Sequence, residues 1–271
     1  MVLSDLIRAA LAEDIGNGDV TAESTIPADK SIEAVIRAKQ DMVFFGHELG
    51  LEVFRQLGVT YVPLVADGAI ILSGSPVAKV SGNARACLSG ERVALNLMMR
   101  MSGISTHTAS VVKGISNIKV VDTRKTTPLW RKWERAAVRA GGGGNHRFAL
   151  YDGILIKDNH IAAVGSINAA IAAAKSHAHH LLKIEIEVED LNQLLEAIEA
   201  GADAVMLDNM SDIELKQAIE LAAGRVMIEA SGNMTGERIR RIQHLGIDVV
   251  SMGGLIHQAT WADLSMKISS S

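Results

Sequence analysis

Short apolar runs that each end in polar residues recur through the second half of the chain, and this repeat limits the fold more than any other feature. The runs cover residues 154–156, 184–188, 204–207, 226–228 and 249–250. Segments with helical periodicity separate the later runs, at 190–200, 211–223 and 235–245. Apolar strands that alternate with helices are typical of a parallel sheet covered by helices. We therefore expect a repeating β/α unit.

Residues 120–121, directly before Asp122, are predicted to form the first strand of this sheet. We expect the strands to curve into a closed or nearly closed β/α barrel; a doubly wound open sheet is the alternative. In both architectures the reactive groups lie at the carboxyl ends of the strands. The polar residues that follow the apolar runs would all lie at that end.

The first hundred residues have a different pattern. Strands are predicted at 31–39 and across 61–80, with a turn at Asp67-Gly68, so this part should be a separate lobe of helices and strands. A helix at 3–12, capped near Ser4, and a long helix at 88–112 are also expected. We place the domains at 1–106 and 107–257. A C-terminal helix within 258–271 is expected to pack back on the first lobe, with 269–271 frayed.

Positive charge is concentrated in one segment. Between Asp122 and His160 there are eight Lys and Arg against four Asp and Glu, a net +4, whereas the whole chain has a net charge of −4. This local excess favours a small anionic ligand over nucleic acid. The single cysteine, Cys87, excludes an internal disulfide and fits a cytoplasmic protein, and no membrane segment is expected.

Two neighbouring motifs fall in this positive segment. Thr127-Pro128 predicts a helix start and Gly141 a helix stop. The arginines spaced every four residues between them are expected to form a solvated or subunit-facing stripe: Arg131, Arg135 and Arg139. Glycines 141–144 are followed by His146-Arg147, and a flexible loop that ends in two donors suits a bound carboxylate.

Further polar residues end the later apolar runs. Lys157 would need an anion or a chemical task, although an ion pair with an acid of the sheet is the alternative. Glu185 and Glu187 share one strand face by the period of two, and with Asp208 they could hold Mg²⁺, sugar hydroxyls or the cations opposite. The ends at 231–233 and 253–254 have the glycines of a phosphate site built from backbone amides.

These motifs together resemble those of the quinolinate phosphoribosyltransferases. The resemblance lies in Asp122-Thr-Arg-Lys-Thr-Thr-Pro, Gly141-Gly-Gly-Gly-Asn-His-Arg, Leu155-Ile-Lys-Asp-Asn-His, Met206-Leu-Asp-Asn and Glu229-Ala-Ser-Gly. It extends in order from Leu11 to His257. It implies an α/β fold with an N-terminal α/β sandwich lobe and a C-terminal incomplete β/α barrel. It also implies a homodimer or higher homo-oligomer, with each active site shared between one subunit's barrel and the other's N-terminal lobe.

The resemblance assigns roles residue by residue. The residues expected to bind the two carboxylates of quinolinate are Arg124, His146, Arg147, Lys157 and, from the neighbouring subunit, Arg92. Lys125 would lie near the phosphates of phosphoribosyl pyrophosphate, and Glu187 and Asp208 near its ribose hydroxyls and Mg²⁺. The expected 5′-phosphate residues are Ser231, Gly232, Gly253 and His257. Departures from the family pattern occur at Leu129, Ala136 and Asn233.

The implied reaction is transfer of phosphoribose to quinolinate with loss of CO₂, giving nicotinate mononucleotide for NAD biosynthesis, with Lys125, Lys157, Glu187 and Asp208 as catalytic residues. Two alternatives remain from the residues alone. A lysine that ends an apolar barrel strand is also how Schiff-base aldolases place their nucleophile, which would be Lys157. A protein that binds phosphorylated metabolites without turnover is the other.

Overall fold

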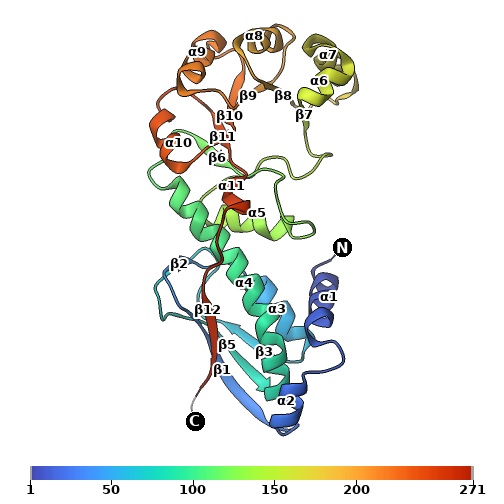
Figure 1. The fold of residues 1–271 in the computed structure, drawn as a ribbon, viewed down its shortest axis with the longest axis vertical. Helices are drawn as coiled ribbons and strands as arrows, with labels where there is room; N and C mark the ends of the chain where they lie inside the picture. The colour runs from blue at the N-terminus through green and yellow to red at the C-terminus, as the bar shows by residue number, and fades with distance from the viewer. Residues whose placement is uncertain (1, 270–271) are drawn as a thin grey trace. The chain divides into compact units, whose positions relative to one another are not determined.

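A computed structural model describes residues 2–269 of the chain (Figure 1). The chain divides into two compact units. The first comprises the chain up to Ala109, together with Lys132–Gly142 and the part from Ala259 onward; the second comprises Ser110–Arg131 and Gly143–Gln258. The division falls after Ala109 rather than after residue 106, and residues 132–142 belong to the first unit rather than to the barrel.

The first unit is built on an antiparallel sheet of four strands in the order β12-β1-β5-β3. Its strands are β1 (Ser31–Ala38), β3 (Thr60–Pro63), β5 (Pro76–Asn83) and β12 (Leu264–Ile268), and a small second sheet pairs β2 (Met42–Val43) with β4 (Ile70–Ile71). Its helices are α1 (Leu3–Ile15), α2 (Val20–Thr25), α3 (His47–Gln56), α4 (Ala84–Val112, which continues into the second unit) and α5 (Arg131–Ala140).

Close helix packing forms the core of this unit. On α3, a Cβ at Gly50 would lie 2.9 Å from Sδ of Met98 on α4, and Met98 also contacts the hydroxyl of Tyr61 at 3.5 Å. On β1 the buried residues alternate at Ala34, Ile36 and Ala38, as the period of a strand requires. Apolar residues at this spacing therefore explain both the sheet and the helices that cover it.

Three expectations for this unit and for α5 are wrong. The segment 261–268 is not a helix: β12 pairs antiparallel with β1, so Met266 lies opposite Ile36. Helix α1 starts after Val2 and has no side-chain cap, so Ser4 does not cap it. Helix α5 begins at Arg131 rather than at Thr127. The predicted fraying at 269–271 extends beyond the described residues, which end at Ser269.

The second unit contains six parallel strands in the order β6-β11-β10-β9-β8-β7. The strands are β6 (Lys119–Val121), β7 (Ile154–Ile156), β8 (Ile184–Val188), β9 (Ala204–Asp208), β10 (Met227–Ser231) and β11 (Val249–Ser251). The helices are α6 (Asp158–Val164), α7 (Ile167–His177), α8 (Leu191–Glu199), α9 (Asp212–Ala222), α10 (Gly236–Ile242) and α11 (Gly254–His257).

The strand order identifies an incomplete barrel. Consecutive strands are neighbours from β7 to β11, and the first strand, β6, pairs with the last, β11, so that only the β6–β7 seam of the described sheet is open. Figure 1 shows α7 to α10 in an arc around one side of these strands, where a doubly wound sheet would have helices on both faces. Among the described residues, none of the helices combines the length and the apolar character needed to cross a membrane.

Candidate active site

A cavity of about 530 Å³ lies at the carboxyl ends of the barrel strands. Its lining residues come from the end of every strand of the sheet: Thr123, Arg124, Lys125, His146, Arg147, Leu155, Lys157, Glu187, Met206, Asp208, Asn209, Ser231, Gly232, Asn233 and Ser251. Most of the residues expected at the site are therefore brought together within one unit. Arg92 is exposed on α4 of the other unit.

The strand end after β6 supplies two cations. Arg124 and Lys125 are exposed, and the amide of Lys125 donates to Oγ1 of Thr123 at 3.0 Å, which turns the chain toward the cavity. A Cβ at Gly253 would lie 2.8 Å from Cδ of Lys125 and 3.3 Å from the ring of His257. Gly253 therefore leaves room for the Lys125 side chain. Neither Gly253 nor His257 lines the cavity itself, but Lys125 and His257 both lie close to Gly253.

The loop after the glycines is held against β6 by Asp122. This carboxylate is fully buried and accepts hydrogen bonds from Nδ2 of Asn145 at 2.5 Å and from the amide of His146 at 3.0 Å. The amide of Gly144 donates to the carbonyl of Val120 at 2.7 Å, so the loop adds a short parallel bridge to the open seam of the barrel. Asp122 therefore fixes the position from which His146 and Arg147 enter the cavity.

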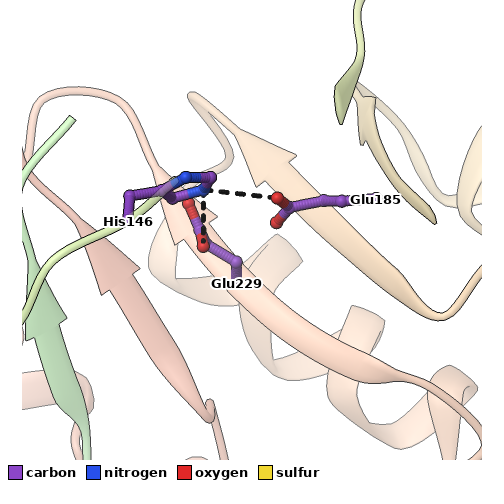
Figure 2. A group of neighbouring side chains, drawn as sticks. All are labelled: His146, Glu185 and Glu229. Carbon is purple, nitrogen blue, oxygen red and sulfur yellow. Dashed lines mark ion pairs between the residues drawn. The ribbon is translucent and has the colours of Figure 1, made fainter. Parts of the chain in front are cut away.

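His146 lies between two acids of the barrel interior, as Figure 2 shows. Its Nε2 is 3.3 Å from Glu185 on β8 and 3.4 Å from Glu229 on β10. Burial lowers the pKa of His146, but the two carboxylates outweigh burial and raise the pKa to about 9. Nδ1 accepts the amide of Arg147 at 2.7 Å, a contact that an imidazolium would lose; two nearby negative charges in a buried site outweigh that one neutral hydrogen bond.

Arg147 projects from the same loop and is anchored on the carbonyl of Gly153, to which its Nη1 donates at 2.8 Å. Burial, followed by the neighbouring charge of Arg124, lowers the pKa of the Arg147 guanidinium. An arginine is nevertheless always protonated in proteins. Two guanidinium groups held close enough to repel each other form a site that an anion would stabilise.

Lys157 and Glu187 form an ion pair across the mouth of the barrel, from the ends of β7 and β8. The Lys157 side chain is 44% exposed, so it is available to a ligand in the cavity, whereas that of Glu187 is 13% exposed. The amide of Lys157 donates to Nδ1 of His160 at 2.9 Å. His160 thus caps the start of α6, which gives the Lys-Asp-Asn-His motif a local structural reason: Lys157 lines the cavity while His160 fixes the turn behind it.

Two asparagines and a glycine line the cavity after the ends of β9 and β10: Asn209, Gly232 and Asn233. Asn209 and Asn233 both have positive φ, 56° and 48°, and Nδ2 of Asn233 donates to Oδ1 of Asn209 at 3.1 Å. Gly232 has a φ of 85°, and a Cβ there would collide with Asn209. Asn tolerates the left-handed region, so Asn233 replaces the glycine expected there without straining the loop.

Glu187 and Asp208 fit a magnesium ion that is shared with a substrate. Both line the cavity from adjacent strands, and Oδ2 of Asp208 accepts from Nδ2 of Asn209 at 2.6 Å. Mg²⁺ is usually held by one or two carboxylates together with substrate phosphates and water, and two carboxylates on one rim satisfy the protein's part. The donor set is thus suitable for Mg²⁺ once a phosphorylated substrate is present.

The sequence pattern assigns no role to Asp122 and Glu229, although an acid beside an apolar run is a signal for a buried partner. Arg135, expected in a solvated or subunit-facing stripe, is buried with 5% exposure. The pair of acids on β8 does share one face, but its members have different partners: His146 for Glu185 and Lys157 for Glu187.

Leu129 stands where a glycine is expected, and the structure gives it a φ of 70°. A leucine in the left-handed region costs about 1–2 kcal/mol, and Leu129 is 63% exposed, so little packing offsets this cost. Leu129→Gly is expected to raise the free energy of unfolding by about 1 kcal/mol, measured by urea denaturation. A Leu129→Ala variant, which keeps a Cβ, serves as the control, and its free energy of unfolding should rise less. A loss of stability in Leu129→Gly would contradict the strained backbone.

The chain resembles known proteins along nearly its whole length. The family model for the C-terminal domain of quinolinate phosphoribosyl transferase matches residues 104–267, and that for its N-terminal domain matches residues 19–102. A probable nicotinate-nucleotide pyrophosphorylase [carboxylating] from Bacillus subtilis is 44% identical, over 98% of this chain and 93% of the relative.

Solved structures of similar proteins also match nearly the whole chain. NadC from Streptococcus pyogenes is 44% identical with a TM-score of 0.93, covering 98% of this chain and 95% of that structure. The nicotinate-nucleotide pyrophosphorylase from Francisella tularensis is 37% identical with a TM-score of 0.93, covering 98% and 96%. The two family models together match residues 19–102 and 104–267, and the chain therefore belongs to the quinolinate phosphoribosyl transferase family.

Proposed function

We propose that this chain transfers phosphoribose from phosphoribosyl pyrophosphate to the nitrogen of quinolinate, and that the product loses CO₂ to give nicotinate mononucleotide and pyrophosphate. It is thus a carboxylating pentosyltransferase of NAD biosynthesis. The observation that carries the proposal is the composition of one cavity, where Arg124, Lys125, Arg147 and Lys157 meet Glu187 and Asp208. Both substrates are anions, and their mutual repulsion requires several cations in one place.

The cations divide between the two substrates. Arg124, Arg147 and Lys157, with His146, line the cavity and are proposed to hold the two carboxylates of quinolinate. Lys125, which lies close to Gly253, is proposed to bind the phosphates. Ser231 and Gly232, at the end of β10, offer a hydroxyl and a backbone amide for the 5′-phosphate.

The acids serve the bond-breaking step. As the pyridine nitrogen approaches the ribose and pyrophosphate departs, positive charge develops at the ribose carbon, and carboxylates nearby lower the energy of that state. Glu187 and Asp208 are the acids of the cavity lining. Bound Mg²⁺, held by these two residues and the substrate, would neutralise charge on the departing pyrophosphate. After transfer, the ring nitrogen is cationic and stabilises the electron pair that stays on the neighbouring carbon when CO₂ departs, and this carbon then takes a proton from water.

A second subunit is proposed to complete the site. Arg92 is exposed on α4, and its role in the family resemblance is to reach quinolinate in the neighbour's barrel. We propose a homodimer or a higher homo-oligomer, in the cytoplasm, without nucleic-acid or membrane partners. The small net charge and the single buried Cys87 support these last points.

A mixing experiment tests the shared site. Arg92→Ala and Lys157→Ala are each expected to be inactive alone. After subunit exchange at equal amounts, half of the dimers are mixed and each mixed dimer has one intact site of two, so about one quarter of the wild-type activity should return. Exchange is verified with differently tagged subunits. Proven exchange without recovered activity would count against a site built across the interface.

The aldolase alternative is separated by a trapping experiment. If Lys157 formed a Schiff base, borohydride would fix a substrate to it and add mass to the peptide that contains it. The proposed reaction predicts no adduct and instead Mg²⁺-dependent release of pyrophosphate when both substrates are present. Tight binding of both substrates without pyrophosphate release would favour a binding protein and would refute the proposed activity.

A further inference from the structure

The three residues around His146 come from separate elements of the barrel. His146 lies in the loop after the glycines, Glu185 on β8 and Glu229 on β10, and the three side chains converge in Figure 2. Their exposed fractions are 14%, 14% and 6%. Glu185 and Glu229 do not line the large cavity, whereas His146 does. The acids therefore reach a ligand in that cavity only through His146.

The charges of this cluster need a cation. Among the described residues, Oε1 of Glu229 is buried and has no hydrogen-bond partner, and the nitrogen of His146 and the carboxylate oxygens of Glu185 and Glu229 lie within 4.8 Å of one another. Two carboxylates this close in a buried place are costly unless positive charge lies between them. The imidazole is placed there, with its Nε2 directed at both.

Charged groups of both signs surround the cluster. A second cavity of about 210 Å³ adjoins His146 and Glu229. The cations that line one or both cavities with His146 are Lys119 on β6, Arg124 and Lys125 after β6, Arg147 on the same loop and Lys157 after β7. The further acids are Asp122, which accepts from the backbone amide of His146, and Glu187 and Asp208, which line the large cavity. The cations oppose a positive charge on His146, and Glu185 and Glu229 are the acids that contact its Nε2 and favour that charge.

We propose that Glu185 and Glu229 are positioning residues, which orient the His146 ring and favour its cationic form so that it contributes to binding of the dicarboxylate substrate. This inference rests on the proposed function. A neutral histidine at the same place would give a weaker, uncharged contact to the carboxylate. The acids would thus be necessary for substrate affinity without touching the substrate.

Glu229→Gln removes one charge and keeps the shape, so it tests this directly. The pKa of His146 is expected to fall from about 9 toward the ordinary value of about 6.5. At pH 8 the variant would then hold a neutral imidazole, and KM for quinolinate should rise about tenfold, whereas at pH 6 both proteins hold the cation and KM should be nearly equal. The titration of His146 is followed by NMR in the ligand-free protein, and KM at both pH values.

Glu185→Gln provides a second variant with the same expectation, in case one of them fails to fold. Glu220→Gln is the matched control, because Glu220 is 67% exposed on α9 and pairs only loosely with Lys216 at 4.0 Å. An unchanged His146 titration in both variants, or a KM change of equal size at pH 6 and pH 8, would overturn the proposal.

A bound metal ion is the competing explanation for three such ligands. Elemental analysis of the purified protein that finds a transition metal, lost in Glu229→Gln, would also overturn the proposal. The NMR titration requires no substrate, so it remains decisive if the wild-type protein makes no nicotinate mononucleotide. That last result would refute the proposed function rather than the role of the two glutamates.

Discussion

Lys157→Ala is expected to lower kcat/KM for quinolinate by about 100- to 1000-fold. Two effects add: the cation that faces the cavity is lost, and Glu187, which is 13% exposed, keeps a negative charge without its partner. Steady-state release of pyrophosphate measures the loss. Because the Lys157 side chain is 44% exposed, the fold should survive, with an unchanged far-ultraviolet circular dichroism spectrum.

Lys216→Ala is the control for that substitution. Lys216 lies on α9 of the same barrel, with a side chain that is 66% exposed, and pairs only with Glu220 on its own helix at 4.0 Å. Its replacement should leave kcat/KM within a factor of about two. If Lys157→Ala retained comparable activity, the division of the cavity between quinolinate and phosphate groups would be wrong.

Asp122→Ala is expected to lower both stability and activity. The substitution leaves the amide of His146 and Nδ2 of Asn145 without their buried acceptor, at a cost of about 2–4 kcal/mol in the free energy of unfolding. The loop that carries His146 and Arg147 would lose its attachment to β6, so KM for quinolinate should rise by at least about tenfold. Urea denaturation and steady-state kinetics measure the two effects.

Asp152→Ala is a suitable comparison, since Asp152 is exposed and accepts only from the amide of Phe148 near the other end of that loop. It should cost less stability than Asp122→Ala. Equal losses in the two variants would contradict a specific role for Asp122 in fixing the glycine loop.

The β/α repeat could be predicted from the sequence because most positions of the barrel strands are buried. A run such as Ala204–Asp208 is apolar at nearly every position, and helices of regular periodicity separate such runs, so the parallel type of the strands follows from the pattern, whereas it left both a barrel and a doubly wound sheet open. The C-terminal segment was missed because its partner lies far away in the chain. Leu264–Ile268 forms a strand through its pairing with β1. Taken alone, these five residues favour neither a helix nor a strand clearly.

The start of α5 was misplaced for a local reason. Thr127-Pro128 has the composition of a helix start, but Leu129 adopts a positive φ and interrupts the helical backbone before Arg131. A leucine gives no sequence signal for that conformation, because the left-handed region is typical of glycine and asparagine. The surrounding structure imposes it, and propensity alone could not reveal it.

Local sequence patterns also predict only part of the candidate site, because the rest depends on contacts between residues far apart in the chain. Polar residues at strand ends could be predicted to meet, because the carboxyl ends of parallel strands share one edge. Which acid faces which cation depends on sheet register and on the loop that crosses the open seam. Glu185 and Glu187 are equivalent by periodicity, yet one pairs with His146 and the other with Lys157. Only the three-dimensional structure distinguishes Glu185, which is proposed to position His146, from Glu187, which is proposed to contact the substrate.

The central claim is that one cavity joins quinolinate to phosphoribose and releases CO₂. Its most direct test incubates the purified protein with phosphoribosyl pyrophosphate, Mg²⁺ and quinolinate that carries a ¹³C label in the carboxylate next to the ring nitrogen, and follows the products by NMR and mass spectrometry. The account predicts unlabelled nicotinate mononucleotide, pyrophosphate and labelled CO₂ in equal amounts. Binding of both substrates without these products, or a product that retains the label, would contradict it.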